Sequence, residues 1–122
     1  GIFRINKSDY NPISFTPIKL PLINDVQSAF TDAVLVNETI YFIAAAEDAK
    51  SNYLDGEIAG TIFGRFKIDD LSTLEIRELP GKHKFEGITL KEETDTTIKF
   101  LLCEDRDDEK TETIIYSLSL EK

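Results

Sequence analysis

Residues 30–48, FTDAVLVNETIYFIAAAED, decide the fold of this chain. They predict two adjacent β-strands, 31–36 and 39–46, with a tight turn at Asn37-Glu38 between them. The second strand carries apolar side chains at both odd and even positions, which is typical of a strand covered on both faces. The stretch recurs in the same order at residues 85–106, so the sequence predicts a structural repeat.

The repeat extends beyond these two strands. Phe30 matches Phe85, Phe42 matches Phe100, and Thr61-Ile62 matches Thr113-Ile114. Ile2-Phe3 near the start of the chain also resembles Ile62-Phe63. The unit then has two strands buried on both faces, a third that alternates (61–68) and a short amphipathic fourth (74–79). This gradient from buried to exposed strands is typical of one blade of a β-propeller.

The predicted fold class is therefore all-β, with antiparallel four-stranded blade-like repeats. Within one domain, residues 1–29 are the end of a preceding blade and a connector, 30–80 a complete blade, and 81–122 an incomplete blade. The further strands expected are 2–5, 14–20, 85–91, 98–103 (buried on both faces) and 113–120. Because Pro17 lacks an amide hydrogen, its strand must be an edge strand or contain a bulge.

A closed propeller typically has about 4–8 blades, more than this chain encodes. The chain is then a fragment of a propeller, one of several chains that combine, or a small β-sandwich. Strand 113–120 presents an open edge in each case, and open edges are prone to pair. We expect that edge to be covered by the remaining blades, by another copy of the chain, or by the N-terminal hairpin.

Composition limits the classes of partner. The 122 residues carry a net charge of −9, which disfavours binding to nucleic acid or to an anionic membrane surface. Metal cations and basic partners remain compatible with it. No apolar run approaches the roughly 20 residues of a membrane span. The chain begins with Gly and contains no Met, which indicates that its natural start is missing.

Cys103 and His83 are the single residues of their types. One cysteine cannot form an intrachain disulfide, and its apolar context, IKFLLC, predicts a small buried core residue. A cysteine nucleophile would need a nearby base, and His83 has no recognisable spacing to Cys103. His83 itself is a weak candidate for acid–base catalysis, and its alternative is a surface loop residue.

The stretch 30–48, the segment YLDGEIAGTIFG and the motif KFEGI together resemble the bacterial phytase-like and esterase-like β-propeller proteins. The resemblance covers most of residues 30–120. It implies that the Glu of the FEGI motif, Glu86, points into the central channel, often near Ca²⁺. The first copy has Thr31 at that place with Asp32 beside it, so the motif is not repeated.

Strand polarity gathers acidic residues at one rim. The first strand of a blade begins where the antiparallel second strand ends, so carboxylates from both repeats should share one face of the molecule. The predicted metal ligands there are Glu86, Asp32, Glu47, Asp48, Glu104 and Asp105. Such a rim suits Ca²⁺, which takes 6–8 oxygen ligands. Its alternative is a solvated acidic surface, and for Glu86 a channel-facing hydrogen-bond acceptor.

Neighbouring side chains complete the candidate site. Lys82, His83 and Lys84 are expected on the same rim, where they would assist a bound cation in polarising a phosphate or ester. Tyr53 is a candidate for ligand binding, as are Lys82 and Lys84. The function expected from the sequence is a propeller-type binding or scaffold module with a divalent cation site. The alternative is a metal-assisted phosphoester or ester hydrolase of the phytase-like or esterase-like kind.

Overall fold

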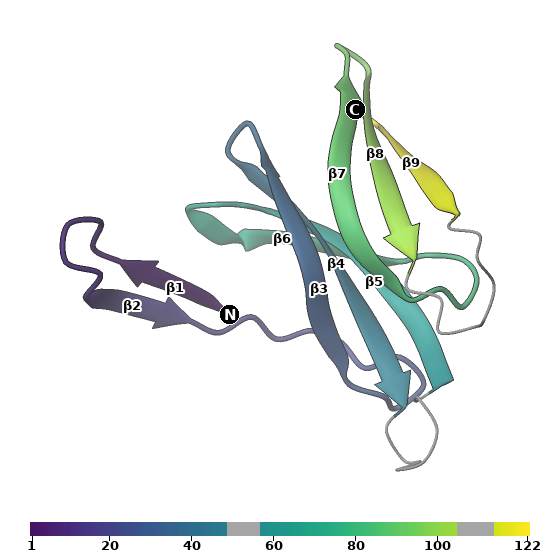
Figure 1. The fold of residues 1–122 in the computed structure, drawn as a ribbon, viewed down its shortest axis with the longest axis horizontal. Helices are drawn as coiled ribbons and strands as arrows, with labels where there is room; N and C mark the ends of the chain where they lie inside the picture. The colour runs from purple at the N-terminus through teal and green to yellow at the C-terminus, as the bar shows by residue number, and fades with distance from the viewer. Residues whose placement is uncertain (49–56, 105–113) are drawn as a thin grey trace.

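The computed structural model describes residues 1–48, 57–104 and 114–122 of the chain (Figure 1). These residues form β-strands and turns but no helix, and therefore no helix that could span a membrane. The strands are β1 (Ile2–Ile5), β2 (Pro12–Thr16), β3 (Ser28–Val36), β4 (Thr39–Asp48), β5 (Glu57–Lys67), β6 (Asp70–Glu78), β7 (Phe85–Glu93), β8 (Thr97–Glu104) and β9 (Ile115–Glu121).

The strands form three antiparallel sheets, each a simple meander in which neighbours in sequence are neighbours in space. Their orders are β1-β2, β3-β4-β5-β6 and β7-β8-β9. The predicted fold class is confirmed: the chain is all-β, and its four-stranded sheet is followed by a three-stranded sheet built in the same way. This arrangement is consistent with a section of a β-propeller and with a small β-sandwich.

The turn between β3 and β4 is the predicted one. Asn37 and Glu38 both have positive φ, 49° and 38°. Positive φ at both central residues is the mark of a type I′ turn, whose twist matches that of the flanking strands. The turn sets the register in which Val36 pairs with Thr39, and the two strands continue from there.

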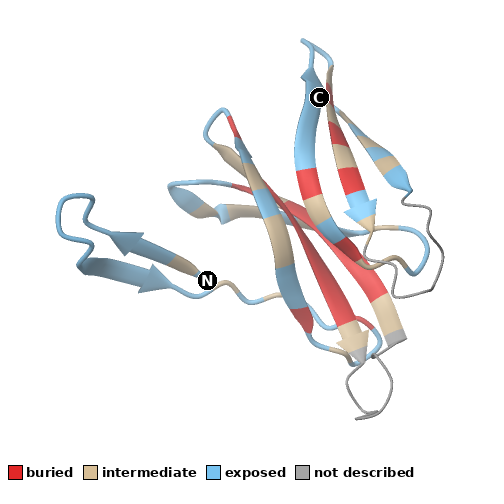
Figure 2. Cartoon of the chain, in the orientation of Figure 1, coloured by how far each residue is buried: buried red, intermediate tan, exposed pale blue. Residues whose placement is uncertain are grey.

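Hydrophobic clusters cover both faces of the sheet β3–β6. On one face, side chains such as Tyr41, Ile43 and Phe63 pack against the sheet β7–β9. On the other, Phe42, Ile62 and Phe66 pack with apolar residues of the segment 18–26, among which Ile23 is buried. Figure 2 shows the result as a buried band along β4 and β5. The prediction that β4 is covered on both faces is confirmed, since residues 41–46 are all buried.

Gly64 allows the tightest packing in this sheet. It lies directly opposite Phe42 in the β4–β5 pairing, and a Cβ atom at this position would collide with the Phe42 ring. The ring lies over the glycine instead and fills the space that a side chain would take. Glycine in a strand often marks such a close approach.

The structure differs from the sequence predictions in how the third strand of each unit is buried. Residues 61–63 of β5 are all buried, so β5 alternates only beyond Gly64. The predicted alternation along 61–68 therefore holds only for the residues after Gly64. Phe63 faces the sheet β7–β9, which covers the second face of β5.

The predicted burial of β8 on both faces is wrong. Ile98, Phe100 and Leu102 are buried against the sheet β3–β6, whereas Lys99 and Leu101 are only partly covered. Cys103 is exposed, which corrects its assignment to the core. The cause is that no described part of the chain covers the outer face of β7–β9.

The N-terminal strands also differ from prediction. β2 is Pro12–Thr16, so it begins two residues and ends four residues before the predicted strand 14–20, and Pro17 lies outside it. The hairpin β1–β2 forms a separate sheet and projects away from the body (Figure 1). It does not cover β9, so that alternative for the open edge is wrong.

Candidate functional site

Two threonines and an aspartate tie the two larger sheets together where β3 meets β7. The Thr31 hydroxyl donates to the Phe85 carbonyl at 2.8 Å, and the Ile88 amide donates to Asp32 Oδ2 at 2.9 Å. Asp32 Oδ1 accepts a further bond from the Ala33 amide at 2.8 Å. The Thr61 hydroxyl donates to the His83 carbonyl nearby. Asp32, a predicted metal ligand, thus uses both carboxylate oxygens to hold backbone amides.

The first strand of each larger sheet carries a β-bulge. The pairing of β3 with β4 shifts between Phe30 and Asp32, and that of β7 with β8 shifts between Phe85 and Gly87, so Thr31 and Glu86 are the extra residues. A bulge re-aims the side chain it carries. The two bulges differ by two residues in register, because Phe30 pairs with Ala44, whereas Phe85 pairs with Glu104, the equivalent of Ala46 when Phe42 is matched with Phe100. The predicted match of Glu86 with Thr31 is therefore not supported by the register.

Glu86 lies with Lys84 and Glu47 at one end of the sheets. The Lys84 ammonium is 3.5 Å from a carboxylate oxygen of Glu47 and 3.5 Å from one of Glu86. The predicted convergence of the end of β4 with the start of β7 is therefore observed. The lysine occupies the space between the carboxylates and offsets their repulsion.

His83 and Glu104 form a second pair on this rim. His83 Nδ1 lies 2.9 Å from Glu104 Oε1, and the Glu104 side chain is only 13% exposed. The imidazole stacks on Phe85 and is tilted against Tyr116, with ring centroids 5.2 Å and 4.9 Å away. Gly81, at φ 82°, turns the chain beneath the ring, and a Cβ there would lie 2.9 Å from His83 Nε2.

His83 lies in the connection between β6 and β7 and is only partly exposed. Its ring forms a cluster with Phe85 and Tyr116, which also contact each other, and its Nε2 faces Gly81. Such an environment positions the connection between β6 and β7 against the end of β8. A histidine–carboxylate pair is also the usual arrangement of a general base. The geometry of His83 with Glu104 is compatible with either role.

The remaining candidates divide between described and undescribed residues. Lys82 is exposed and lines an open hollow of about 490 Å³ with Glu78 and Asn24. Tyr53, Asp105 and the side chain of Asp48 lie outside the described residues. Among the side chains that the structure does describe, no group of three or more His, Cys, Asp or Glu residues is placed to hold a metal ion. The Ca²⁺ site at this rim stays a prediction.

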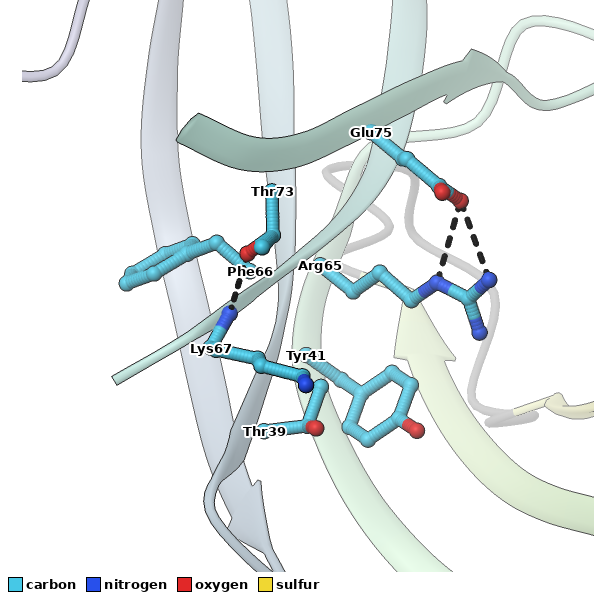
Figure 3. A pocket seen from close by; sticks show the side chains of 7 residues that line it. All are labelled: Thr39, Tyr41, Arg65, Phe66, Lys67, Thr73 and Glu75. Carbon is cyan, nitrogen blue, oxygen red and sulfur yellow. Dashed lines mark hydrogen bonds and ion pairs between the residues drawn. The ribbon is translucent and has the colours of Figure 1, made fainter. Parts of the chain in front are cut away.

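The opposite end of the sheets holds pockets that the sequence did not indicate. One, of about 310 Å³, is lined by side chains of β4, β5 and β6, namely Thr39, Tyr41, Arg65, Phe66, Lys67, Thr73 and Glu75 (Figure 3). The Arg65 guanidinium holds Glu75 Oε2 across it through Nε at 3.1 Å and Nη2 at 3.0 Å. A second, of about 350 Å³, shares Thr39, Tyr41 and Arg65 and reaches Glu93 and Lys122.

The second pocket is a crevice between the two larger sheets, whereas the first is lined by β4, β5 and β6 alone. At the crevice, Glu93 accepts bonds from the Asn37 side-chain amide and the Lys122 ammonium, each at 3.0 Å, and the bond from Asn37 links the β3–β4 turn to β7. Glu93 thus joins the two sheets, whereas Arg65 and Glu75 join two strands of one sheet. The alternation of Arg65 and Lys67 along β5 is the one sequence signal that could have located it.

Comparisons with curated proteins and with solved structures find no match to this chain. A family of unknown function, DUF6929, matches residues 2–120. That match takes in both repeats and the N-terminal hairpin, and the chain therefore belongs to this family.

Proposed function

We propose that this chain is a section of a β-propeller-type binding or scaffold module, to which further blades attach. The observation that carries this proposal is the docking of β3 against β7. The two first strands lie against each other through Thr31 and Asp32, and each contains a bulge. Consecutive blades of a propeller bring their first strands together in this way.

The outer face of β7–β9 supports attachment of a further blade. Cys103 and Ile115 are exposed there, whereas their equivalents in the first repeat, Ala45 and Thr61, are buried beneath the neighbouring sheet. The strand β9 is also an edge, because it pairs only with β8 among the described strands. A sheet with one uncovered face and one open edge is a template for another sheet.

We expect the isolated chain to self-associate through β9, because an open strand edge pairs readily with another. Light scattering across a range of concentrations should show the mass rising with concentration. Replacing Ser117, an exposed residue of β9, by lysine should reduce this association, since lysine on an edge strand opposes pairing. Ser72→Lys adds the same charge at an exposed position of β6 and should leave it unchanged.

Association that Ser117→Lys and Ser72→Lys reduce equally would mean that charge alone is responsible. A chain that stays monomeric at every concentration would contradict attachment through the β9 edge.

The second candidate is a metal-assisted phosphoester or ester hydrolase, phytase-like or esterase-like, with Ca²⁺ at the acidic rim. What supports it is the meeting of Glu47 and Glu86 beside Lys84, with the His83–Glu104 pair on the same rim. For a cation to bind there, the carboxylates must exchange the lysine for the ion. Carboxylate oxygens are ligands that Ca²⁺ prefers.

If this second candidate holds, calorimetry should detect Ca²⁺ binding, and generic phosphate or carboxylate esters should be hydrolysed only with the ion. Glu86→Gln should then abolish metal-dependent turnover, because it removes a charged ligand. Its effect on stability should be small, within about 1 kcal/mol, since Glu86 is exposed and its ion pair with Lys84 is at the surface. Absence of binding, together with unchanged thermal stability in a chelator, would count against the hydrolase.

A further inference from the structure

The repeat allows each face of the two larger sheets to be compared with its equivalent. Phe42 and Phe100 are equivalent, and both rings are fully buried on the same face of their own sheets. Phe100 packs against Tyr41 and Phe63 of the preceding sheet, with centroids 4.8 Å and 5.8 Å away. Phe42 packs instead against Phe30 and Phe66 of its own sheet. The first repeat therefore lacks the aromatic pair that covers the second.

The missing cover leaves a groove beside β3. Phe30 pairs with Ala44 as Ile88 pairs with Leu102 in the second repeat, and Ile88 is 6% exposed whereas Phe30 is 39% exposed. A cavity of about 410 Å³ lies next to Phe30, and its remaining walls are mostly apolar. The sheet contributes Phe30, Thr31, Asp32, Ala33, Ile40, Phe42 and Phe66, and the N-terminal segment contributes Gly1, Ile2 and Ile18. On the second repeat, the equivalent space is filled by side chains from β4 and β5.

The hairpin β1–β2 borders this groove and carries an apolar face of its own. Phe3 lies opposite Phe15 in the pairing, their rings are 4.5 Å apart, and Ile5 and Ile13 continue the apolar surface. All four side chains are more than half exposed (Figure 2). A two-stranded hairpin alone is marginally stable in water, so a further strand and a cover for this face would stabilise it.

The position of the hairpin in the repeat identifies what is absent. Phe3 is the equivalent of Phe63, so β1 and β2 correspond to the third and fourth strands of a blade. Among the described strands, β1 pairs only with β2, and its other edge is open. In a complete blade, that edge pairs with the second strand, as β5 pairs with β4. The first two strands of this blade are the part that the groove lacks.

We propose that the groove beside β3 and the open edge of β1 together bind the inner strand pair of another blade of the same repeat. The second strand of this pair adds to β1 through backbone hydrogen bonds. An aromatic side chain at the position of Tyr41 then lies over Phe42, as Tyr41 lies over Phe100. The inference rests on the propeller-type module proposed above and specifies one of its attachment surfaces.

The chemistry of the groove selects among occupants. The outer face of β7–β9 in a second copy has Lys99 at the position of Tyr41, and Glu92 and Ser119 lie opposite it in the pairing. A lysine ammonium would lose its hydration in this mostly apolar groove, where the carboxylate of Asp32 already accepts from the Ala33 and Ile88 amides. The first two strands of a blade fit this groove better when they carry an aromatic residue at the position of Tyr41. The chain's own β3–β4 hairpin has this pattern and can serve as the probe.

The test uses the full chain and a fluorescently labelled synthetic peptide with the sequence of residues 28–48. Fluorescence anisotropy should show saturable binding, and hydrogen exchange should show protection of the β1 amides. A peptide carrying Tyr41→Ser should bind at least about tenfold more weakly, because burial of an aromatic side chain contributes about 1.5–3 kcal/mol.

Variants of the chain locate the site. Phe30→Asp places a charge in the groove and should also weaken binding at least about tenfold. The matched control is Ile68→Asp, because Ile68 is 42% exposed but does not line the groove. Its affinity for the peptide should equal that of the unaltered chain. Circular dichroism of both variants should retain the β-sheet spectrum.

Three results would overturn the inference: no binding of the peptide, equal weakening by Phe30→Asp and Ile68→Asp, or protection of β9 in place of β1. Self-association of the chain that Phe30→Asp abolishes would also overturn it, by making a second copy the occupant. Failure here is distinguishable from failure of the proposed module. If the chain self-associates through β9 and Ser117→Lys reduces this association, the proposed module stands even when the proposal for the groove fails.

Discussion

Replacement of Phe100 by alanine is expected to lower the free energy of unfolding by about 3–5 kcal/mol. The Phe100 side chain is fully buried at the centre of the interface between the two larger sheets. Its ring contacts Tyr41 and Phe63 from the facing sheet, so its removal leaves a cavity that neither sheet can close alone. Urea denaturation followed by circular dichroism measures the change.

The control for this substitution is Phe3→Ala. Phe3 is 71% exposed, and substitutions at exposed sites usually change stability by no more than about 0.5 kcal/mol. If Phe100→Ala cost no more than Phe3→Ala, the packing of β7–β9 on β3–β6 would not contribute to stability as described. Unchanged urea dependence, the m-value, in both variants would show that the surface exposed on unfolding is the same.

Replacement of Asp32 by alanine is expected to cost about 1–3 kcal/mol, because it leaves the amide of the buried residue Ile88 without its acceptor. The loss should be the same with Ca²⁺ and with a chelator, since the carboxylate holds backbone amides from β3 and β7. Thermal unfolding in the two solutions compares them. Asp95→Ala, at an exposed turn, removes the same charge and should change stability little.

A chelator that removed the difference between Asp32→Ala and the unaltered chain would assign Asp32 to a cation site instead. Asp32→Asn separates the contributions further. Asparagine keeps a carbonyl oxygen that can accept from the Ile88 amide, so it should restore part of the stability lost in alanine. A metal-binding role would predict that asparagine restores little, because the charged oxygen is lost.

The repeat was the part of the fold that the sequence carried most clearly. Phe42 and Phe100 occupy equivalent places, because each is the fourth residue of its strand and each points to a covered face of its own sheet. The turn at Asn37-Glu38 was also predictable, since its two residues separate strands whose apolar patterns are unbroken on either side. Local pattern and turn chemistry act over a few residues, and they can be read without knowing what packs on the strand.

Burial of β8 and Cys103 could not be predicted in the same way. The apolar run 98–103 matches the covered strand β4, but coverage depends on a neighbouring sheet that the described chain does not supply. Asp32 shows the same limit for the candidate site. Its partner, the Ile88 amide, becomes available only where a bulge and the docking of two sheets bring them together.

The acidic rim contains one feature that could be predicted from the sequence and others that could not. Strand polarity was enough to bring Glu47 and Glu86 to one end of the sheets, because it follows from antiparallel order alone. That Lys84 lies between them, and that the His83 ring packs against Phe85 and Tyr116, depends on the path of a short connection. The positions of side chains in such a connection depend on three-dimensional packing, which the spacing of residues in the sequence does not reveal.

The meander order of the strands has a consequence for the way the chain folds. Each strand of the three sheets pairs with its neighbour in sequence, and the entropic cost of closing a loop rises only with the logarithm of its length. The hairpin around Asn37-Glu38 closes a loop of two residues, as short as the loop between β5 and β6, and hairpins form on the scale of microseconds. We expect Thr31 and Asp32 to reach β7 only after both sheets have assembled, with docking of one sheet on the other as the slow step. The hairpins then form first, and the interface between the sheets forms last.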